Sequence, residues 1–196
     1  MRALRICEAL LIALALVLCV AVLDVAVHGQ TADLAERFTF IALKAPKSIV
    51  DGDRLTITLD RWSTDAERDK VVAAFTDGGT NGVLGGVRDS GAIGYLRWPG
   101  GLEYAVRYAR RIPQPDGGLD VILITDRPLW VWWDSSVTAN HNAPFSAVLL
   151  KMRKNGVGEG VMAMPESVTS DKANGVAIKN PSGLPALLSD VRRSNS

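Results

Sequence analysis

Hydrophobic and polar residues alternate along much of the chain, and this alternation predicts a series of β-strands. In the segment 53–62, DRLTITLDRW, Leu55, Ile57 and Leu59 alternate with polar residues, as expected for a strand with one buried face. The same period of two, or a short apolar run, predicts further strands at 37–43, 92–98, 102–112, 119–126, 145–153, 157–164, 175–180 and 186–193.

One segment changes to a helical period. In 63–79, STDAERDKVVAAFTDGG, Thr64 and Glu67 have the spacing of a capping box, and Val71, Val72 and Phe75 form one apolar stripe. The two glycines at the end of this segment tolerate the left-handed conformation that often follows a helix. A weaker helical turn is predicted at 80–90, where further glycines lower the helix propensity.

Turn signals separate the strands by hairpin lengths. PQPDGG at 113–118 predicts one turn, and Asn155-Gly156 between two apolar runs predicts a tight hairpin whose central residues have positive φ. A parallel sheet would need a crossover, usually a helix, between each strand pair, and only one good helix is predicted. The pattern therefore predicts a mainly β (α+β) fold, in which a single antiparallel sheet is curled into a barrel or half-barrel, with one inserted helix after the second strand.

The first 29 residues have the layout of a secretory signal peptide. A basic start is followed by the uncharged apolar run Ala9–Leu23 and a small-residue exit before Gln30. An uncleaved membrane anchor is the alternative, but the run is shorter than the roughly 20 residues that span a bilayer. The predicted organisation is a signal peptide at 1–29, a leader at 30–36 and one antiparallel β domain at 37–193. The protein is expected to be exported to the periplasm or the extracellular space, and to meet the membrane only through the signal segment before cleavage.

Composition narrows the chemistry of the exported domain. Both cysteines, Cys7 and Cys19, and one of the two histidines, His28, lie in the predicted signal peptide. The remaining chain would have no thiol nucleophile and no set of histidines or cysteines for zinc, so neither a metal nor a cofactor is predicted. Removing the segment leaves the net charge at +1, which gives no reason to expect nucleic acid as a partner.

Four segments carry a resemblance to a known family. They are ITLDRWSTDAERDKVVAAF, GYLRWPGGLEYAVRYAR, PDGGLDVILITDRPLWVWW and GVGEGVMAM, which together cover roughly Phe38 to Ala177. The chain resembles an uncharacterised family of exported bacterial proteins, in which a strand ending in Asp-Arg-Trp runs into a Ser-Thr-Asp-Ala-Glu-Arg helix and a later strand ends in Thr-Asp-Arg-Pro. The resemblance implies an exported domain and no activity or site residues. The WVWW segment is more aromatic than the family pattern.

The segment TDRPLWVWWD at 125–134 is the first candidate binding site. Pro128 cannot donate to a strand ladder, which places the tryptophans at a strand end, on an edge strand or in a lid. In an extended segment Trp130 and Trp132 share one face and Trp133 takes the other, so at least one indole is expected to pack in the core. The tryptophans could stack on a flat ligand, fill one end of the barrel, or contact a lipid or a protein partner.

Arginines on neighbouring predicted strands are the second candidate. Arg107 and Arg127 are assigned to ligand binding, within a set that also contains Arg97, Arg110 and Arg111. Converging guanidinium groups could hold a carboxylate or phosphate, whereas a solvated face of salt bridges is the alternative. Alternation predicts that Arg107 and Arg111 lie on the face opposite Tyr104 and Tyr108.

Evidence for an enzyme is weaker. Asp60, Asp126 and Asp134 could supply a carboxylate pair, and His141 could assist Ser135 or Ser136, but no spacing requires either arrangement. The chain also lacks a Gly-x-Ser-x-Gly elbow, a phosphate loop and an EF-hand loop. The sequence favours an exported, non-enzymatic binding module for a small apolar or flat ligand or a protein partner. The alternative is a carboxylate-dependent hydrolase.

Overall fold

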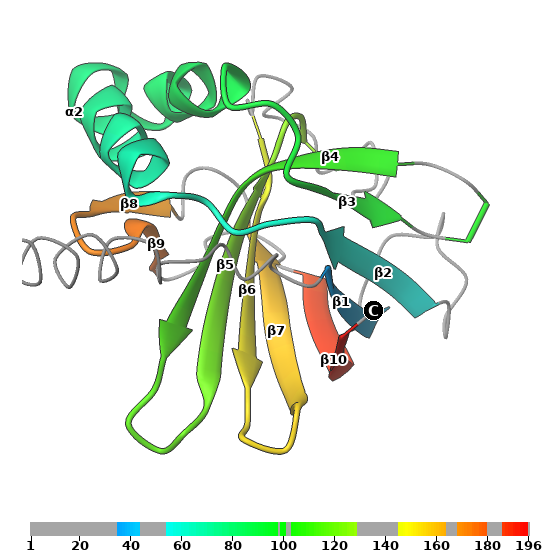
Figure 1. Cartoon of the computed structure of the whole chain (residues 1–196). Coiled ribbons are helices and arrows are strands. Elements are labelled where there is room, and N and C mark those ends of the chain that lie inside the picture. The colour runs from blue at the N-terminus through cyan, green and yellow to red at the C-terminus, as the bar shows by residue number, and fades with distance from the viewer. Residues whose placement is uncertain are drawn as a thin grey trace, which may run out of the picture. The chain divides into compact units, whose positions relative to one another are not determined.

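The computed structural model describes residues 35–43, 54–97, 99–100, 103–128, 145–163, 168–179 and 186–195. Eight of its strands form one closed barrel (Figure 1). They are β1 (Glu36–Leu43), β2 (Arg54–Leu59), β3 (Gly94–Arg97), β4 (Glu103–Pro113), β5 (Leu119–Thr125), β6 (Ala147–Met152), β7 (Val157–Ala163) and β10 (Ala186–Asn195).

The barrel follows the predicted antiparallel architecture and closes completely. Its strand order is β1-β10-β7-β6-β5-β4-β3-β2, and every neighbouring pair is antiparallel. The last strand pairs with the first, from Glu36 opposite Asn195 to Leu43 opposite Leu187. The protein is therefore a closed eight-stranded barrel, with the predicted helix inserted after the second strand.

Side chains fill the barrel interior. The alternating residues of each strand that point inward form one continuous apolar cluster. Its largest fully buried members are Phe38, Phe40, Leu55, Ile57, Leu59, Ile93, Leu96 and Leu123. Eight-stranded barrels have interiors just wide enough for such packing, and the described part of this one is occupied by its own side chains.

A β-bulge in β4 changes which residues face inward. Val106 pairs with Thr125, whereas Tyr108 pairs with Ile124, so Arg107 is an extra residue on its strand. Tyr104 packs in the barrel interior, but Tyr108 packs on the outer side. The prediction that the two tyrosines share one face is therefore wrong, because simple alternation does not anticipate a bulge.

The helix and a short hairpin cover part of the outer surface. Helix α2 (Asp65–Arg88) begins with the predicted capping box at Thr64 and Glu67. A non-helical kink at Gly79, with φ 57°, divides it into two helical segments, which confirms the predicted helix end at the two glycines and the predicted helical segment at 80–90. Strands β8 (Val168–Asp171) and β9 (Gly175–Ile178) form a separate two-stranded sheet, of which only the second strand was predicted. Together with α2 they build a second apolar cluster over Tyr108 and the outward residues of β5 and β6. Among the described residues, no helix has the length and apolar character needed to cross a membrane.

The β6–β7 hairpin turns through Lys154, Asn155 and Gly156. The Gly156 N–H donates to the Arg153 carbonyl at 2.9 Å, and the Arg153 N–H donates to the Val157 carbonyl at 2.9 Å. Gly156 has φ 77°, whereas Asn155 does not have positive φ. The predicted hairpin is present, but positive φ at both central residues is wrong, because a three-residue loop with a left-handed glycine replaces the two-residue turn.

We predict that Gly156→Val lowers the free energy of unfolding by about 1–3 kcal/mol, since a β-branched residue is strained at positive φ. Urea denaturation followed by circular dichroism measures the change. Lys154→Val is the matched control, because Lys154 lies in the same loop without positive φ. Equal midpoints for the two variants would contradict the prediction.

Candidate functional site

The three candidate tryptophans lie outside the described residues. Trp130, Trp132 and Trp133 belong to the segment 129–144, as do Asp134, Ser135, Ser136 and His141. The described chain leaves β5 at Thr125 and re-enters the barrel at β6, and these two strands are neighbours. The role assigned to the tryptophans stays a prediction.

Four of the five candidate arginines have partners within the fold. Arg97 pairs with Glu103 at 3.1 Å, Arg110 with Asp65 at 3.1 Å, and Arg111 approaches Glu36 at 3.7 Å. Arg127 donates to the Glu103 carbonyl at 2.7 Å and lies 4.8 Å from the centre of the Tyr104 ring. Three of these arginines lie in ion pairs, whereas Arg127 binds a backbone carbonyl and lies over an aromatic ring, and the assignment of Arg127 to ligand binding stays a prediction.

Arg107 differs from the other four. In the described part of the chain its side chain has no ion pair, and its Nε is buried without a hydrogen-bond partner. The β4 bulge lies opposite the end of β5, and the next residue after that strand, Asp126, also has a buried oxygen, Oδ1, without a partner. Arg111, beyond the bulge, lies near Glu36 and the Trp62 ring.

The candidate carboxylates are not brought together by neighbouring strands. Asp60 follows β2 and Asp126 follows β5, and two strands, β3 and β4, separate them in the barrel. The backbone N–H of Asp60 donates to Ile93 and that of Asp126 to Ala105, which ties each residue to its own neighbouring segment. Within the described ranges no group of three or more His, Cys, Asp or Glu side chains could hold a metal ion.

The Asp-Arg-Trp and Ser-Thr-Asp-Ala-Glu-Arg segments fasten the helix to the barrel. Arg61 binds both oxygens of Glu67, at 2.8 and 2.9 Å, and the same carboxylate receives the Thr64 backbone N–H. The hydrogen bonds with Arg61 lower the pKa of Glu67 to about 2, against the smaller opposing effect of burial. These residues therefore have a structural role at the start of α2.

Trp62 is part of a second polar cluster, at the start of β1. Its indole N–H donates to the buried carboxylate of Glu36 at 3.2 Å, and Arg193 Nε donates to the other oxygen at 2.8 Å. The Arg111 guanidinium lies 5.6 Å from the Trp62 ring. A buried carboxylate needs such partners, and this cluster joins β1, β4 and β10.

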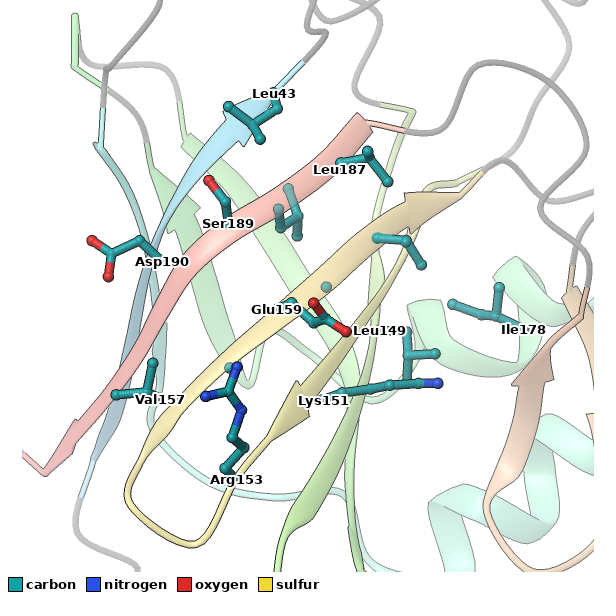
Figure 2. A pocket seen from close by; sticks show the side chains of 14 residues that line it. Leu43, Leu149, Lys151, Arg153, Val157, Glu159, Ile178, Leu187, Ser189 and Asp190 are labelled. Atoms are coloured by element: carbon teal, nitrogen blue, oxygen red, sulfur yellow. The ribbon is translucent and has the colours of Figure 1, made fainter.

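The described residues form a groove on the outside of the barrel. It has a volume of about 690 Å³ and crosses β6, β7 and β10, with Leu43 of β1 and Ile178 of β9 at its margins (Figure 2). None of these residues is among the candidates that the sequence indicated. Outward positions on β6 and β7 can be read from alternation, but their meeting with β10 and β1 depends on pairings that local patterns do not reveal.

An apolar row forms the core of the groove. Leu149 pairs with Val161, Val161 with Leu187, and Leu187 with Leu43, so four residues in register cross four strands. On its other side Leu149 pairs with Ile122, which is buried beneath the helix and the short hairpin. The row thus leaves the covered core and becomes exposed, with Leu187 38% and Leu43 44% accessible.

A charged row lies beside the apolar one. Lys151 pairs with Asp120 on β5 and with Glu159 on β7, two residues further along β6 than Leu149. Burial raises the pKa of Asp120, and the nearby Lys151 partly opposes this effect. Figure 2 shows Lys151 and Arg153 at the opposite end of the groove from Leu43 and Leu187.

Gly160 on β7 lies opposite Leu150, whose side chain is part of the barrel core, so a side chain on Gly160 would point inward. A Cβ there would lie 2.6 Å from the Leu149 carbonyl oxygen and 2.8 Å from the Leu150 side chain. Glycine therefore lets β7 lie close to β6, and Gly158 and Gly160 contribute only backbone to the groove lining.

Fold and site together define an eight-stranded antiparallel barrel with a filled interior and an apolar groove on its outer face. Comparisons with protein-family models, curated proteins and solved structures found no match to this chain.

We predict that Glu67→Gln reduces the acid sensitivity of the fold. A carboxyl whose folded pKa is lowered stabilises the protein above its unfolded value of 4.5 and loses this contribution as the pH falls towards about 2. Because Arg61 is 41% exposed, the loss is about 1 kcal/mol. Thermal melting between pH 7 and pH 2 measures it, with Glu159→Gln as the control. If the melting temperature of Glu67→Gln falls with decreasing pH as steeply as that of the wild type, the prediction is wrong.

Proposed function

We propose that the protein is an exported, non-enzymatic binding module that holds a small apolar ligand in the groove across β6, β7 and β10. The observation that carries the proposal is the apolar row of Leu149, Val161, Leu187 and Leu43, which is partly buried at Leu149 and Val161 and exposed at Leu187 and Leu43. Contiguous exposed apolar surface with a polar rim is typical of interaction sites.

The dimensions of the groove support a small ligand. Its volume of about 690 Å³ lies within the range of roughly 300–1,000 Å³ that small-molecule sites occupy. The filled interior supports an outer-face site, because the described core side chains already occupy the space that other eight-stranded barrels use for a ligand.

No observation favours the hydrolase alternative. The two described candidate aspartates, Asp60 and Asp126, follow strands that are not neighbours in the barrel. Each donates its backbone N–H to an adjacent segment, which accounts for an aspartate at the end of a strand without catalysis. The unpartnered atoms of Arg107 and Asp126 mark a polar spot beside the start of segment 129–144, where the predicted tryptophan site would lie.

Export is expected from the N-terminal layout. We predict that the protein recovered from the periplasm or the medium begins near Gln30, because the apolar run Ala9–Leu23 is shorter than a membrane span. N-terminal sequencing of the recovered protein tests this. Recovery only in the membrane fraction with Met1 intact would show that the segment is an anchor.

The groove is tested with the neutral fluorescent probe N-phenyl-1-naphthylamine. We predict that Leu187→Asp weakens probe binding at least tenfold, since the variant loses apolar contact and places a carboxylate in the groove. Tyr95→Asp is the matched control, because Tyr95 is 36% exposed, close to the 38% of Leu187, and lies on β3 outside the groove. Fluorescence titration gives the dissociation constants. Equal weakening in both variants, or none in either, would contradict the assigned site.

A further inference from the structure

The lining of the groove holds two cations, Lys151 and Arg153, and two carboxylates, Glu159 and Asp190. Asp190 binds Arg54 and Arg192, two arginines that lie outside the lining. Glu159 is therefore the one carboxylate of the lining that is left to offset Lys151, its partner across the strands, and Arg153. None of these last three side chains has an ion pair among the described residues.

The cations gather at one end of the apolar row. Lys151 and Arg153 both follow Leu149 on the outward side of β6, whereas the other end of the row is Leu43 on β1. Four strands at a spacing of about 4.8 Å make the row about 14 Å long. An apolar row with two cations at one end is complementary to an amphiphile that has one apolar chain and an anionic head group.

We propose that the ligand is a free fatty acid, whose acyl chain lies along Leu43, Leu187, Val161 and Leu149 and whose carboxylate meets Lys151 and Arg153. This inference rests on the proposed function and names the ligand class of the same groove. Arg153 contributes the less compensated charge, because it lies opposite Val157, whereas Lys151 lies between Asp120 and Glu159.

The experiment compares three ligands with the same chain of twelve carbons: dodecanoate, 1-dodecanol and dodecyltrimethylammonium. Each displaces N-phenyl-1-naphthylamine from the full-length protein at micromolar concentration, so that every ligand is monomeric. We expect dodecanoate to bind at least five-fold more tightly than the alcohol and the cation to bind more weakly than both.

Charge variants locate the head group. The double variant Lys151→Gln/Arg153→Gln should weaken dodecanoate about ten-fold and leave 1-dodecanol unchanged. Lys154→Gln/Lys172→Gln is the matched control, since it removes two exposed cations that do not line the groove. Glu159→Gln should tighten dodecanoate a few-fold, because it removes the carboxylate opposite Lys151.

The outcomes separate the two proposals. Equal affinity for the three ligands, or equal weakening of dodecanoate in both double variants, would overturn the fatty-acid assignment and leave an apolar groove. Failure of the probe and of all three ligands to bind would overturn the proposed function as well. Sedimentation with phosphatidylglycerol vesicles without binding of monomeric dodecanoate would replace the free fatty acid by a lipid surface.

Discussion

The pairing of β1 with β10 is the contact on which the rest of the structure depends. It joins the first and last strands of the described domain over the length of β1, and it converts an open sheet into a barrel. Closure removes the free edges of this sheet and encloses the side chains of its inner face. The buried carboxylate of Glu36 lies at the end of the same seam, where Arg193 of β10 and Trp62 bind it. An unpaired buried charge there would be costly. The closed seam between β1 and β10 therefore depends on the pairing of Glu36 with Arg193 and Trp62.

The fold covers the outer face of the closed barrel unevenly. Helix α2 and the β8–β9 hairpin pack over β4, β5 and part of β6, whereas β7, β10 and the adjoining part of β1 keep exposed apolar residues. The row from Ile122 through Leu149 to Leu43 crosses this boundary without a break in register. The groove is therefore an extension of the second apolar cluster beyond the elements that cover it.

Local patterns in the sequence predicted most strands, the capped helix and the antiparallel barrel or half-barrel, because alternation and capping depend on residues close together in the chain. The Arg107 bulge, the four-residue strand β8 and the left-handed Gly156 without a left-handed Asn155 were not anticipated, since each is decided by the pairing partner or the loop length. The groove was missed for a related reason. Leu149 and Leu43 are more than a hundred positions apart, and only the barrel register places them in one row.

The division between the barrel interior and the exposed groove separates the residues that stabilise the fold from those of the proposed binding site. Arg153 is exposed and Leu187 is 38% accessible, so changing them costs the barrel less than changing a fully buried core residue. A barrel that holds its ligand inside must instead leave part of its core unfilled, and each unfilled volume lowers stability. Here the inner faces of the eight strands stabilise the fold, whereas exposed outward residues of the groove such as Arg153 can vary in charge and size at little cost. In the proposed function, ligand preference is therefore set by a few outward side chains of the groove.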